Sequence, residues 1–473
     1  MPDQQHHELQ APWSRSDRFL PRTVVQPLQE FMQASTAGSL VMLLAAITAI
    51  AWANSPWSQA YHDLWATEFA LNLGRWELAL DLRHWVNDAL MTIFFLLVGL
   101  EIKRELTTGE LRQVRQAALP VVAAIGGMVA PALIYVALTL GREGGAGWGI
   151  PMATDIAFAL GVLTLAARHA PPSLKPMLLT LAIVDDIGAI LVIALFYSDG
   201  LSLAWLQAGA VVLVLIVIAR QVGIRSTAVY WILGAVLWLE FLEAGIHPTI
   251  TGVILGLLTP AVAFQRSAAV SELAARTAEQ TKDAIDVDSD AHWWFRLSEL
   301  SREAVSPLVR IEHQLLPWSS FLIVPLFALA NAGVELSFDA LRGAATGAVG
   351  LGVFLGLVVG KPLGIWLASA VAIRTGLARL PRGVTLRHVA LMGVTAGIGF
   401  TVSLFIAELA FDAEMLRDEA KIAILAASLV AGVVGLVLFR VTGEPADPAT
   451  VSEEVADPSA PGGGDEGSVS AAP

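Results

Sequence analysis

Apolar residues occur along the chain in long runs that are separated by short charged or Gly/Pro-rich breaks. A run of about 20 apolar residues can cross a bilayer as a helix. The pattern therefore predicts an all-α polytopic membrane protein with twelve transmembrane helices. The predicted spans lie near residues 37–53, 86–103, 117–139, 151–168, 176–198, 203–220, 226–242, 247–260, 317–336, 344–373, 388–410 and 421–440.

Lysine and arginine residues are distributed unequally between the loops on the two sides of the predicted bundle. The side that carries both chain ends holds 22 of the 29, and the opposite side holds 6. Loops rich in these residues stay in the cytoplasm, so both ends are expected to be cytoplasmic. No short apolar run with a small-residue cleavage site precedes the first span, so we expect no removable signal peptide.

The longest predicted external loop covers residues 54–85. In it, the short runs 69–73 and 76–80 flank a Gly-Arg pair, which predicts a small external β-hairpin. An exposed strand edge can pair with another chain. The segment 69–80 could therefore join two copies of the protein.

The other long polar segments are expected on the cytoplasmic side of a twelve-helix domain that covers residues 36–440. They are an N-terminal arm, 1–35, an extended loop, 264–312, and a C-terminal tail, 441–473. The second half of the loop mixes aromatic and charged residues, which suits an interfacial amphipathic helix. The tail is rich in Pro, Gly, Ser and acidic residues, a composition typical of disorder.

The composition agrees with a membrane protein, because 55% of the residues are hydrophobic and only 15% are charged. Soluble proteins carry about 25% charged residues. The formal net charge is −13, but 16 of the 42 acidic residues lie in 264–312 and 441–473. No basic patch interleaved with aromatic residues is present, which argues against a nucleic acid partner. Cysteine is absent, which excludes disulfides and cysteine-ligated metal sites.

Two acidic residues, Asp185 and Asp186, stand side by side in a run that is otherwise apolar from Pro176 to Tyr197. A carboxylate at membrane depth is costly, so such a residue is a functional candidate by default. Two adjacent carboxylates cost more, because like charges disfavour joint ionisation. A single acid of this kind could be neutral and hydrogen-bonded to a neighbouring helix. The doublet instead predicts a site that binds protons or cations.

Three further features fall within predicted spans. Thr154 and Asp155 place a hydroxyl beside another intramembrane acid. Lys361 lies deep in the run 344–373 and precedes a proline, and the alternative for it is a snorkelling side chain. A Gly/Thr-rich stretch, 395–401, interrupts the eleventh span.

Broken helices at membrane depth expose N–H and C=O groups that carry partial charge. Such breaks are tolerated only against protein or a water-filled cavity. An acid such as Asp155 suits the positive helix ends, and a cation such as Lys361 suits the negative ends. Interrupted segments in corresponding halves of a chain indicate the ion site of a secondary transporter. Here the two halves would be spans three to five and spans ten to twelve.

Glycine recurs at every fourth position through the tenth span. This gives the predicted helix one smooth face, which is typical of close packing against a neighbouring helix. The residues are Gly352, Gly356, Gly360 and Gly364.

Oxygen ligands suit a small hard cation. A carboxylate binds either a proton or a cation, so the two would compete for Asp185 or Asp186. Alternate exposure of such a site to the two sides of the membrane gives exchange without a covalent step. The residues therefore predict a transporter, not an enzyme, and no cofactor.

The chain resembles the NhaA-type sodium/proton antiporter family of bacteria from about residue 36 to residue 440. The resemblance is specific, because it lies in the stretches that carry the unusual polar residues. These stretches are Phe94–Glu105, Thr154-Asp155, Asp185-Asp186, Pro325–Gly333, Gly360–Gly364 and Gly397–Thr401.

The resemblance implies inverted repeats of helices III–V and X–XII, with crossed discontinuous helices IV and XI. It implies an electrogenic, pH-activated antiporter of the bacterial cell (inner) membrane. Such a protein expels internal Na⁺ or Li⁺ in exchange for a larger number of external protons, which serves pH and sodium homeostasis. The resemblance also implies a homodimer that forms through the external hairpin.

The resemblance further implies roles for single residues. Asp185 and Asp186 would form the cation and proton site that holds Na⁺ or Li⁺, with Thr154 nearby. Asp155 and Lys361 would compensate the partial charges of the broken helix ends, and Lys361 would also pair with Asp185.

Alkaline activation in this family acts through residues at the cytoplasmic mouth. Glu101, Glu105 and Glu312 fall on matching positions, with surface carboxylates at helix ends as the alternative. His247 matches a family position as well, but a satisfied structural histidine is the favoured interpretation. The extended loop 264–312 and the acidic tail depart from the pattern of the family.

Three other functions remain as alternatives. A related transporter could move K⁺ or an organic anion with Na⁺. An intramembrane aspartyl protease also needs two acids, but adjacent residues point about 100° apart on one helix, and the Gly-x-Gly-Asp signature is missing. A channel is disfavoured, because no filter-like carbonyl loop or charged ring is evident.

Overall fold

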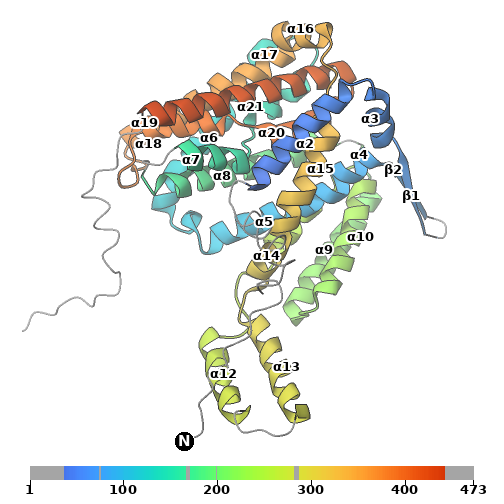
Figure 1. The fold of residues 1–473 in the computed structure, drawn as a ribbon, viewed down its shortest axis with the longest axis vertical. Helices are drawn as coiled ribbons and strands as arrows, with labels where there is room; N and C mark the ends of the chain where they lie inside the picture. Colours follow the sequence, from blue (N-terminus) through green and yellow to red (C-terminus); the bar gives the residue numbers. More distant parts are fainter. Residues whose placement is uncertain (1–36, 74–75, 167–170, 199, 282–286, 443–473) are drawn as a thin grey trace, which may run out of the picture.

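The computed structural model describes residues 37–73, 76–166, 171–198, 200–281 and 287–442 (Figure 1). These residues are mostly helical. The predicted arm 1–35 lies outside the described residues, as does the predicted tail beyond Thr442. The first half contains α2 (Ala37–Ala53), α3 (Ser58–Trp65), β1 (Glu68–Leu73), β2 (Trp76–Asp81), α4 (Leu82–His84), η3 (Trp85–Leu90), α5 (Met91–Thr107), η4 (Glu110–Arg112), α6 (Val114–Thr139), η5 (Gly145–Met152), α7 (Ile156–Ala166), α8 (Leu174–Phe196), α9 (Leu203–Val222) and α10 (Thr227–Ala244).

The second half begins with a short helix and ends with the longest one. It contains α11 (Ile250–Leu258), α12 (Ser267–Thr281), α13 (Val287–Glu303), α14 (Pro307–Trp318), η6 (Ser319–Ile323), α15 (Val324–Asn331), α16 (Phe338–Thr346), α17 (Ala348–Leu355), η7 (Gly356–Gly360), α18 (Lys361–Arg374), α19 (Leu386–Ala396), α20 (Phe400–Ala410) and α21 (Glu414–Thr442).

Helices lie at all twelve predicted spans, but not all of these helices can cross a membrane alone. Among the described residues, nine helices are long and apolar enough to do so, or up to eleven if each of two bent pairs counts as one span. Two of the helices are too short to count as spans by themselves: α2 has 17 residues and α11 has 9. The number twelve therefore stays a prediction.

The external loop contains the two predicted strands. β1 and β2 pair antiparallel in a two-stranded sheet, with Phe69 opposite Leu80 and Leu71 opposite Leu78. The Gly-Arg pair between them lies outside the described residues. The position of this sheet on the external side stays a prediction.

The extended loop contains two helices rather than one. α12 and α13 lie side by side and project away from the rest of the bundle (Figure 1). On α13, Trp294 and Phe295 are exposed, as expected for an amphipathic helix. An interfacial location for α13 stays a prediction.

The glycine stripe packs helices closely, as predicted. A Cβ atom on Gly364 would lie 2.1 Å from the carbonyl oxygen of Gly126 on α6, and one on Gly360 would lie 2.9 Å from Pro131 Cα. No side chain fits at such distances. The stripe therefore brings α18, which begins with Lys361, against α6.

Two of the segments near the centre of the bundle are broken. Residues Ala153–Asp155 are extended between η5 and α7, and residues 397–399 separate α19 from α20, with a bend of 51°. A π-helical turn, η7, directly precedes Lys361, and turns of this kind occur frequently at functional sites. The first of these breaks reaches the middle of α8, where Thr154 contacts Asp185.

Candidate functional site

Asp185 on α8 and Lys361 on α18 form a fully buried ion pair. The distance from Lys361 Nζ to Asp185 Oδ2 is 2.9 Å, and neither side chain is exposed. The Thr154 hydroxyl donates a hydrogen bond to the same carboxylate oxygen at 2.7 Å. The predicted pairing of Lys361 with Asp185 is therefore confirmed, and a snorkelling Lys361 is excluded by its burial.

Asp186, the next residue on α8, has a different environment. Its side chain is buried but lines a cavity of about 340 Å³, together with Glu101, Thr154 and Asp155. No group among the described residues hydrogen-bonds to Asp186 Oδ1 or to Asp185 Oδ1. Each member of the doublet thus keeps one buried oxygen that can accept a proton or contact a cation.

The two broken segments contact each other beside the doublet. The Asp155 backbone N–H donates to the Ile398 carbonyl at 2.7 Å, and the Thr154 hydroxyl lies 3.1 Å from the Ala396 carbonyl. These bonds satisfy backbone groups that the breaks expose. They also fix Thr154 next to Asp185.

Charged side chains meet the ends of the broken helices. The Asp155 carboxylate accepts hydrogen bonds from Phe158 N at 3.1 Å, from Thr401 N at 3.3 Å and from Thr401 Oγ1 at 2.7 Å. The carboxylate thus caps the N-termini of α7 and α20, where the helix dipoles favour negative charge. The Lys361 ammonium donates to the Met152 carbonyl at the C-terminal end of η5, where the helix dipole favours positive charge.

The three glutamates at the predicted cytoplasmic mouth have separate environments. Glu101 lines the same cavity as Asp186. Glu105 accepts hydrogen bonds from Glu110 N at 2.8 Å and from the Thr180 hydroxyl at 3.2 Å. Glu312 forms an ion pair with Arg104, between α14 and α5. Only Glu101 therefore shares a space with the doublet.

His247 lies away from the doublet, against the ring of Phe405 with 5.1 Å between ring centroids. Its Nδ1 lies 2.7 Å from the Thr249 hydroxyl, and its Nε2 lies 3.5 Å from Asp88 Oδ1. The hydrogen bond with Thr249 satisfies one ring nitrogen, and a carboxylate lies near the other, in agreement with a structural histidine.

Several polar residues at or near this region were not singled out in the sequence. Ser39, Ser319 and Ser320 place hydroxyl groups in the wall of the cavity that Asp186 lines. Glu408 and Lys421 form a second buried ion pair. Both lie at the ends of predicted spans, 388–410 and 421–440, where a charged residue is ordinary, so the rule for a charge at membrane depth does not single them out.

The described part of the chain contains no group of three or more His, Cys, Asp or Glu side chains that could hold a metal ion. A cation at the doublet would take its oxygens from the two carboxylates and from hydroxyl or carbonyl groups nearby. Such a mixed set of hard ligands suits a small cation as cargo.

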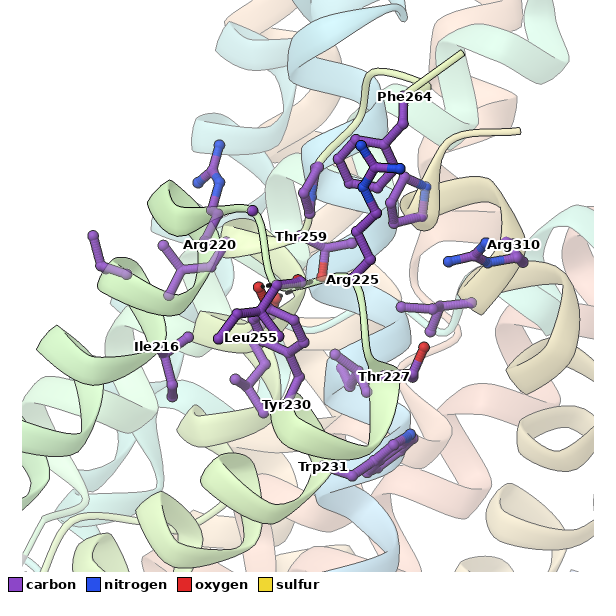
Figure 2. A pocket seen from close by; sticks show the side chains of 18 residues that line it. Ile216, Arg220, Arg225, Thr227, Tyr230, Trp231, Leu255, Thr259, Phe264 and Arg310 are labelled. Carbon is purple, nitrogen blue, oxygen red and sulfur yellow. Dashed lines mark hydrogen bonds between the residues drawn. The ribbon is translucent and has the colours of Figure 1, made fainter. Parts of the chain in front are cut away.

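A second pocket, of about 120 Å³, lies between α9, α10 and the start of α14 (Figure 2). Arg220, Arg225 and Arg310 line it, with Phe264 stacked 4.7 Å from the Arg225 guanidinium. Arg225 also pairs with Glu303 at the end of α13. No residue of the acidic doublet lines this pocket.

Comparison with known proteins supports one family. The Na⁺/H⁺ antiporter 1 family matches residues 29–439. The Na(+)/H(+) antiporter NhaA 2 of Sorangium cellulosum (strain So ce56) is 46% identical over 439 residues, which cover 92% of this chain and 94% of the relative. The Na(+)/H(+) antiporter NhaA of Anaeromyxobacter sp. (strain Fw109-5) is 47% identical over 422 residues, which cover 89% and 92%.

Among solved structures, the sodium proton antiporter MjNhaP1 from Methanocaldococcus jannaschii matches with a TM-score of 0.48 and 13% identity, over 88% of this chain and 98% of that chain. The sequence match covers most of the chain, and the described helices are long and apolar enough to span a membrane many times. The chain is a multi-pass membrane protein that belongs to the Na⁺/H⁺ antiporter 1 family.

Proposed function

We propose that the chain is an electrogenic, pH-activated Na⁺(Li⁺)/H⁺ antiporter that expels internal sodium in exchange for external protons. The observation that supports this most is the asymmetry of the doublet. Asp185 is held by Lys361 and Thr154, whereas Asp186 faces a cavity, and each carboxylate keeps one oxygen without a hydrogen-bond partner among the described residues. These oxygens are the positions at which a proton and a cation compete.

Each step of the exchange can be assigned to groups in this site. Asp185 and Asp186 bind protons from one side and release them when Na⁺ or Li⁺ binds. Thr154 supplies a neutral oxygen beside Asp185. If Asp186 and the Asp185–Lys361 pair each give up one proton when one cation binds, two protons are exchanged for one cation, and this unequal exchange is electrogenic.

Asp155 and Lys361 hold the crossing of the broken segments. Asp155 neutralises the positive ends of α7 and α20, and Lys361 neutralises the negative end of η5. With these charges in place, both breaks can persist beside the cavity. The crossing would then move as a unit when the site changes its exposure.

The cavity indicates which side the site faces. It extends from Asp186 to the first turn of α2 and to the junction of α14 and η6. The distribution of Lys and Arg assigns these ends to the cytoplasm. We therefore place the protein in the bacterial inner membrane with cytoplasmic termini and the site open inward. Glu101, Glu105 and Glu312 lie on this side and form the proposed pH-responsive group.

A protease is disfavoured by the same geometry. A pair of catalytic aspartates must share a proton and activate water between them. One oxygen of Asp185 is instead occupied by the Lys361 ammonium.

The two-stranded β-sheet of the external loop supports the proposed homodimer through residues 69–80. This dimer does not affect the chemistry of the site.

Fluorescence dequenching in acid-loaded everted vesicles tests the proposal. Addition of Na⁺ or Li⁺, but not K⁺, is expected to release protons, more strongly at alkaline than at mildly acidic pH. An imposed membrane potential is expected to change the rate, because the exchange carries net charge. Proton release that is independent of all three cations would contradict the proposed function.

A further inference from the structure

The last helix, α21, runs along both halves of the broken segment formed by α19 and α20. It is 29 residues long, and it lies beside both of these helices (Figure 1). A Cβ atom on Gly435 would lie 2.8 Å from Thr395 Cγ2, and one on Gly397 would lie 3.5 Å from Ala431 Cβ. A continuous helix therefore supports the segment at the point where its own helical hydrogen bonds are interrupted.

Two polar contacts hold α20 at a fixed position along α21. At the beginning of α20, the Phe400 N–H donates to the Ser428 hydroxyl at 3.2 Å. Near its end, Glu408 forms an ion pair with Lys421, and the two side chains are only 7% and 4% exposed. Arg417 Nη1 lies 3.3 Å from the other carboxylate oxygen of Glu408. The contacts follow opposite orders in the two helices, so α20 and α21 are antiparallel and are joined at two points.

The spacing of these residues places the contacts on one face of each helix. Ser428 follows Lys421 by seven residues on α21, which is two helical turns or about 10 Å. Glu408 follows Thr401 by the same number of residues on α20. Residues two turns apart share a face, so the face of α20 that carries Glu408 at one end carries Thr401 at the other.

Thr401 is the residue through which α20 reaches the candidate ion site. Its N–H and its hydroxyl both donate to the Asp155 carboxylate, at 3.3 Å and 2.7 Å. The residue next to Asp155 is Thr154, whose hydroxyl donates to Asp185 at 2.7 Å. A shift of α20 along α21 would therefore be transmitted, through two hydrogen-bonded residues, to the carboxylate of the doublet.

We propose that Glu408 and Lys421 are positioning residues for the cation site, which they hold in place by fixing α20 lengthwise on α21. Neither residue lines the cavity that Asp186 faces, so the pair acts through Thr401 and not by contact with the cation. The inference rests on the proposed transport function for what the site binds. The position of α20 does not depend on that function.

An ion pair suits this task better than apolar packing does. Apolar side chains keep much of their contact area when one helix slides a short distance along another, whereas a buried charge that loses its partner is strongly disfavoured. Buried polar groups are best known for fixing the register of packed helices. The Glu408–Lys421 pair therefore selects one position of α20, and the Ser428 hydroxyl supports the same position at the other end.

A double variant tests the proposal without leaving a buried charge unpaired. Glu408→Gln/Lys421→Met keeps side chains of similar size. Arg417 is 23% exposed and lines a polar cavity of about 480 Å³, so it stays solvated. Two quantities are measured: the hydrogen–deuterium exchange of the Phe400 and Thr401 amides in the purified protein, and the Na⁺ concentration for half-maximal proton release in vesicles.

Both amides are expected to exchange faster in the double variant than in the wild type, because α20 is then held at one end only. The Na⁺ concentration for half-maximal release is expected to rise about tenfold, within the range for residues that act on a site through intervening contacts. Lys421→Arg keeps the positive charge, and the cavity that Lys421 lines has room for the larger guanidinium. This conservative variant should therefore keep the wild-type values.

A matched control separates positioning from general stability. Leu237→Ala removes a fully buried side chain from the apolar cluster between α9 and α10. It should lower the melting temperature, as large-to-small core substitutions do, and leave the Na⁺ requirement unchanged. An equal rise in the Na⁺ requirement in Leu237→Ala would overturn the proposal, because lost stability would then explain the effect.

Wild-type values of both quantities in the folded double variant would also overturn the proposal, as would faster amide exchange without a change in the Na⁺ requirement. If the double variant does not fold, Ser428→Ala removes only the acceptor of the Phe400 N–H. It is expected to change both quantities in the same direction by a smaller factor, and no change would again overturn the proposal. Absence of cation-driven proton release in the wild type would refute the proposed function instead, and the amide exchange would still test whether the pair holds α20.

Discussion

The Lys361 ammonium lies 2.9 Å from one oxygen of Asp185 and makes no ion pair with its neighbour Asp186 among the described residues. Two identical residues that are adjacent in the sequence thus have opposite environments. Asp185 is compensated by a buried cation, and Asp186 faces a cavity with acidic residues around it. We therefore expect Asp185 to contribute to the stability of the fold, and both residues to contribute to transport.

Asparagine substitutions should therefore separate the two acids by stability, although both abolish exchange. Asp185→Asn leaves Lys361 buried without its partner, so we expect a loss of about 3–5 kcal/mol of stability. Asp186→Asn removes a carboxylate that has no such partner, so its thermal melt should be near wild type. Both variants should lose about 100-fold or more of cation-driven proton release, because loss of a ligand should cost at least as much as mutation of the groups that support ligands, which costs about 10–100-fold.

The control for this pair is Asp63→Asn, which changes an exposed acid on α3. It should transport and melt as the wild type does. Wild-type exchange in Asp186→Asn would remove this residue from the cation site. Equal melting temperatures of the two doublet variants would contradict the different environments described above.

Lys361→Ala should destabilise the protein and impair transport together. The substitution removes the cation that pairs with Asp185 and the donor that contacts the Met152 carbonyl. A loss of about 3 kcal/mol or more is expected, because a buried carboxylate is left without compensation. Lys175→Ala, at an exposed position on α8, is the matched control. Wild-type melting and transport in Lys361→Ala would refute the pairing.

Thr154 should affect cation affinity more than stability. Its hydroxyl donates to Asp185 at 2.7 Å and lies beside the cavity. Thr154→Val keeps the shape and removes the hydroxyl, so the Na⁺ concentration for half-maximal proton release should rise about tenfold, as for the loss of a hydrogen bond to a charged group. Thr154→Ser retains the hydroxyl and should keep the wild-type value. A similar change in both variants would show that the hydroxyl alone does not set the cation affinity, and a wild-type value in Thr154→Val would show that the hydroxyl is not needed.

The doublet could be predicted because a carboxylate in a long apolar run has few structural explanations. The break after Ala396 was visible as Gly and Thr residues, and Lys361 stood out in its span for the same reason as the doublet. In each case a charged or helix-breaking residue lies in a segment that is otherwise apolar and helical. Sequence reasoning therefore succeeds where one residue conflicts with its own segment.

Other parts of the site depend on which helices pack against each other. The sequence pattern does not show this packing. The Glu408–Lys421 pair requires the packing of α20 on α21. The serine hydroxyls of the cavity wall come from α2 and η6, and serine is common in helices that only pack. The sequence pattern also does not settle the number of spans, because α11 is mostly apolar but too short to cross a membrane by itself.

Gly364→Ala should disturb the site from a distance. A Cβ atom at this position would lie 2.1 Å from the Gly126 carbonyl oxygen, so α18 must move away from α6. Overpacking of this kind costs about 1–3 kcal/mol, and the movement displaces Lys361, one turn away. Gly432→Ala is the control, because its Cβ would meet Ile398 at an ordinary 3.8 Å. A wild-type melt in Gly364→Ala would show that the two helices are not tightly packed.

The ion pair between Arg225 and Glu303 lies outside the membrane-spanning segments and should make the stability of this region depend on pH. The hydrogen bond from the Arg225 guanidinium holds the pKa of Glu303 below its ordinary value of 4.5. A carboxylate whose pKa is lowered by folding adds stability above its unfolded pKa, and this contribution is lost as the pH falls through the folded pKa. The pair fastens the end of α13 to the turn between α9 and α10.

Arg225→Gln should therefore loosen the α12–α13 pair at neutral pH and have no further effect in acid. The loss is expected to be about 1 kcal/mol or less, because the pair is partly exposed, and limited proteolysis between α12 and α13 is sensitive enough to detect it. Faster cleavage than in the wild type at pH 7, and equal cleavage once Glu303 is protonated, is the predicted result. Arg276→Gln removes the exposed pair with Glu272 on α12 and should change nothing. A difference between Arg225→Gln and the wild type that persists in acid would show that Arg225 acts through its stacking on Phe264 rather than through Glu303.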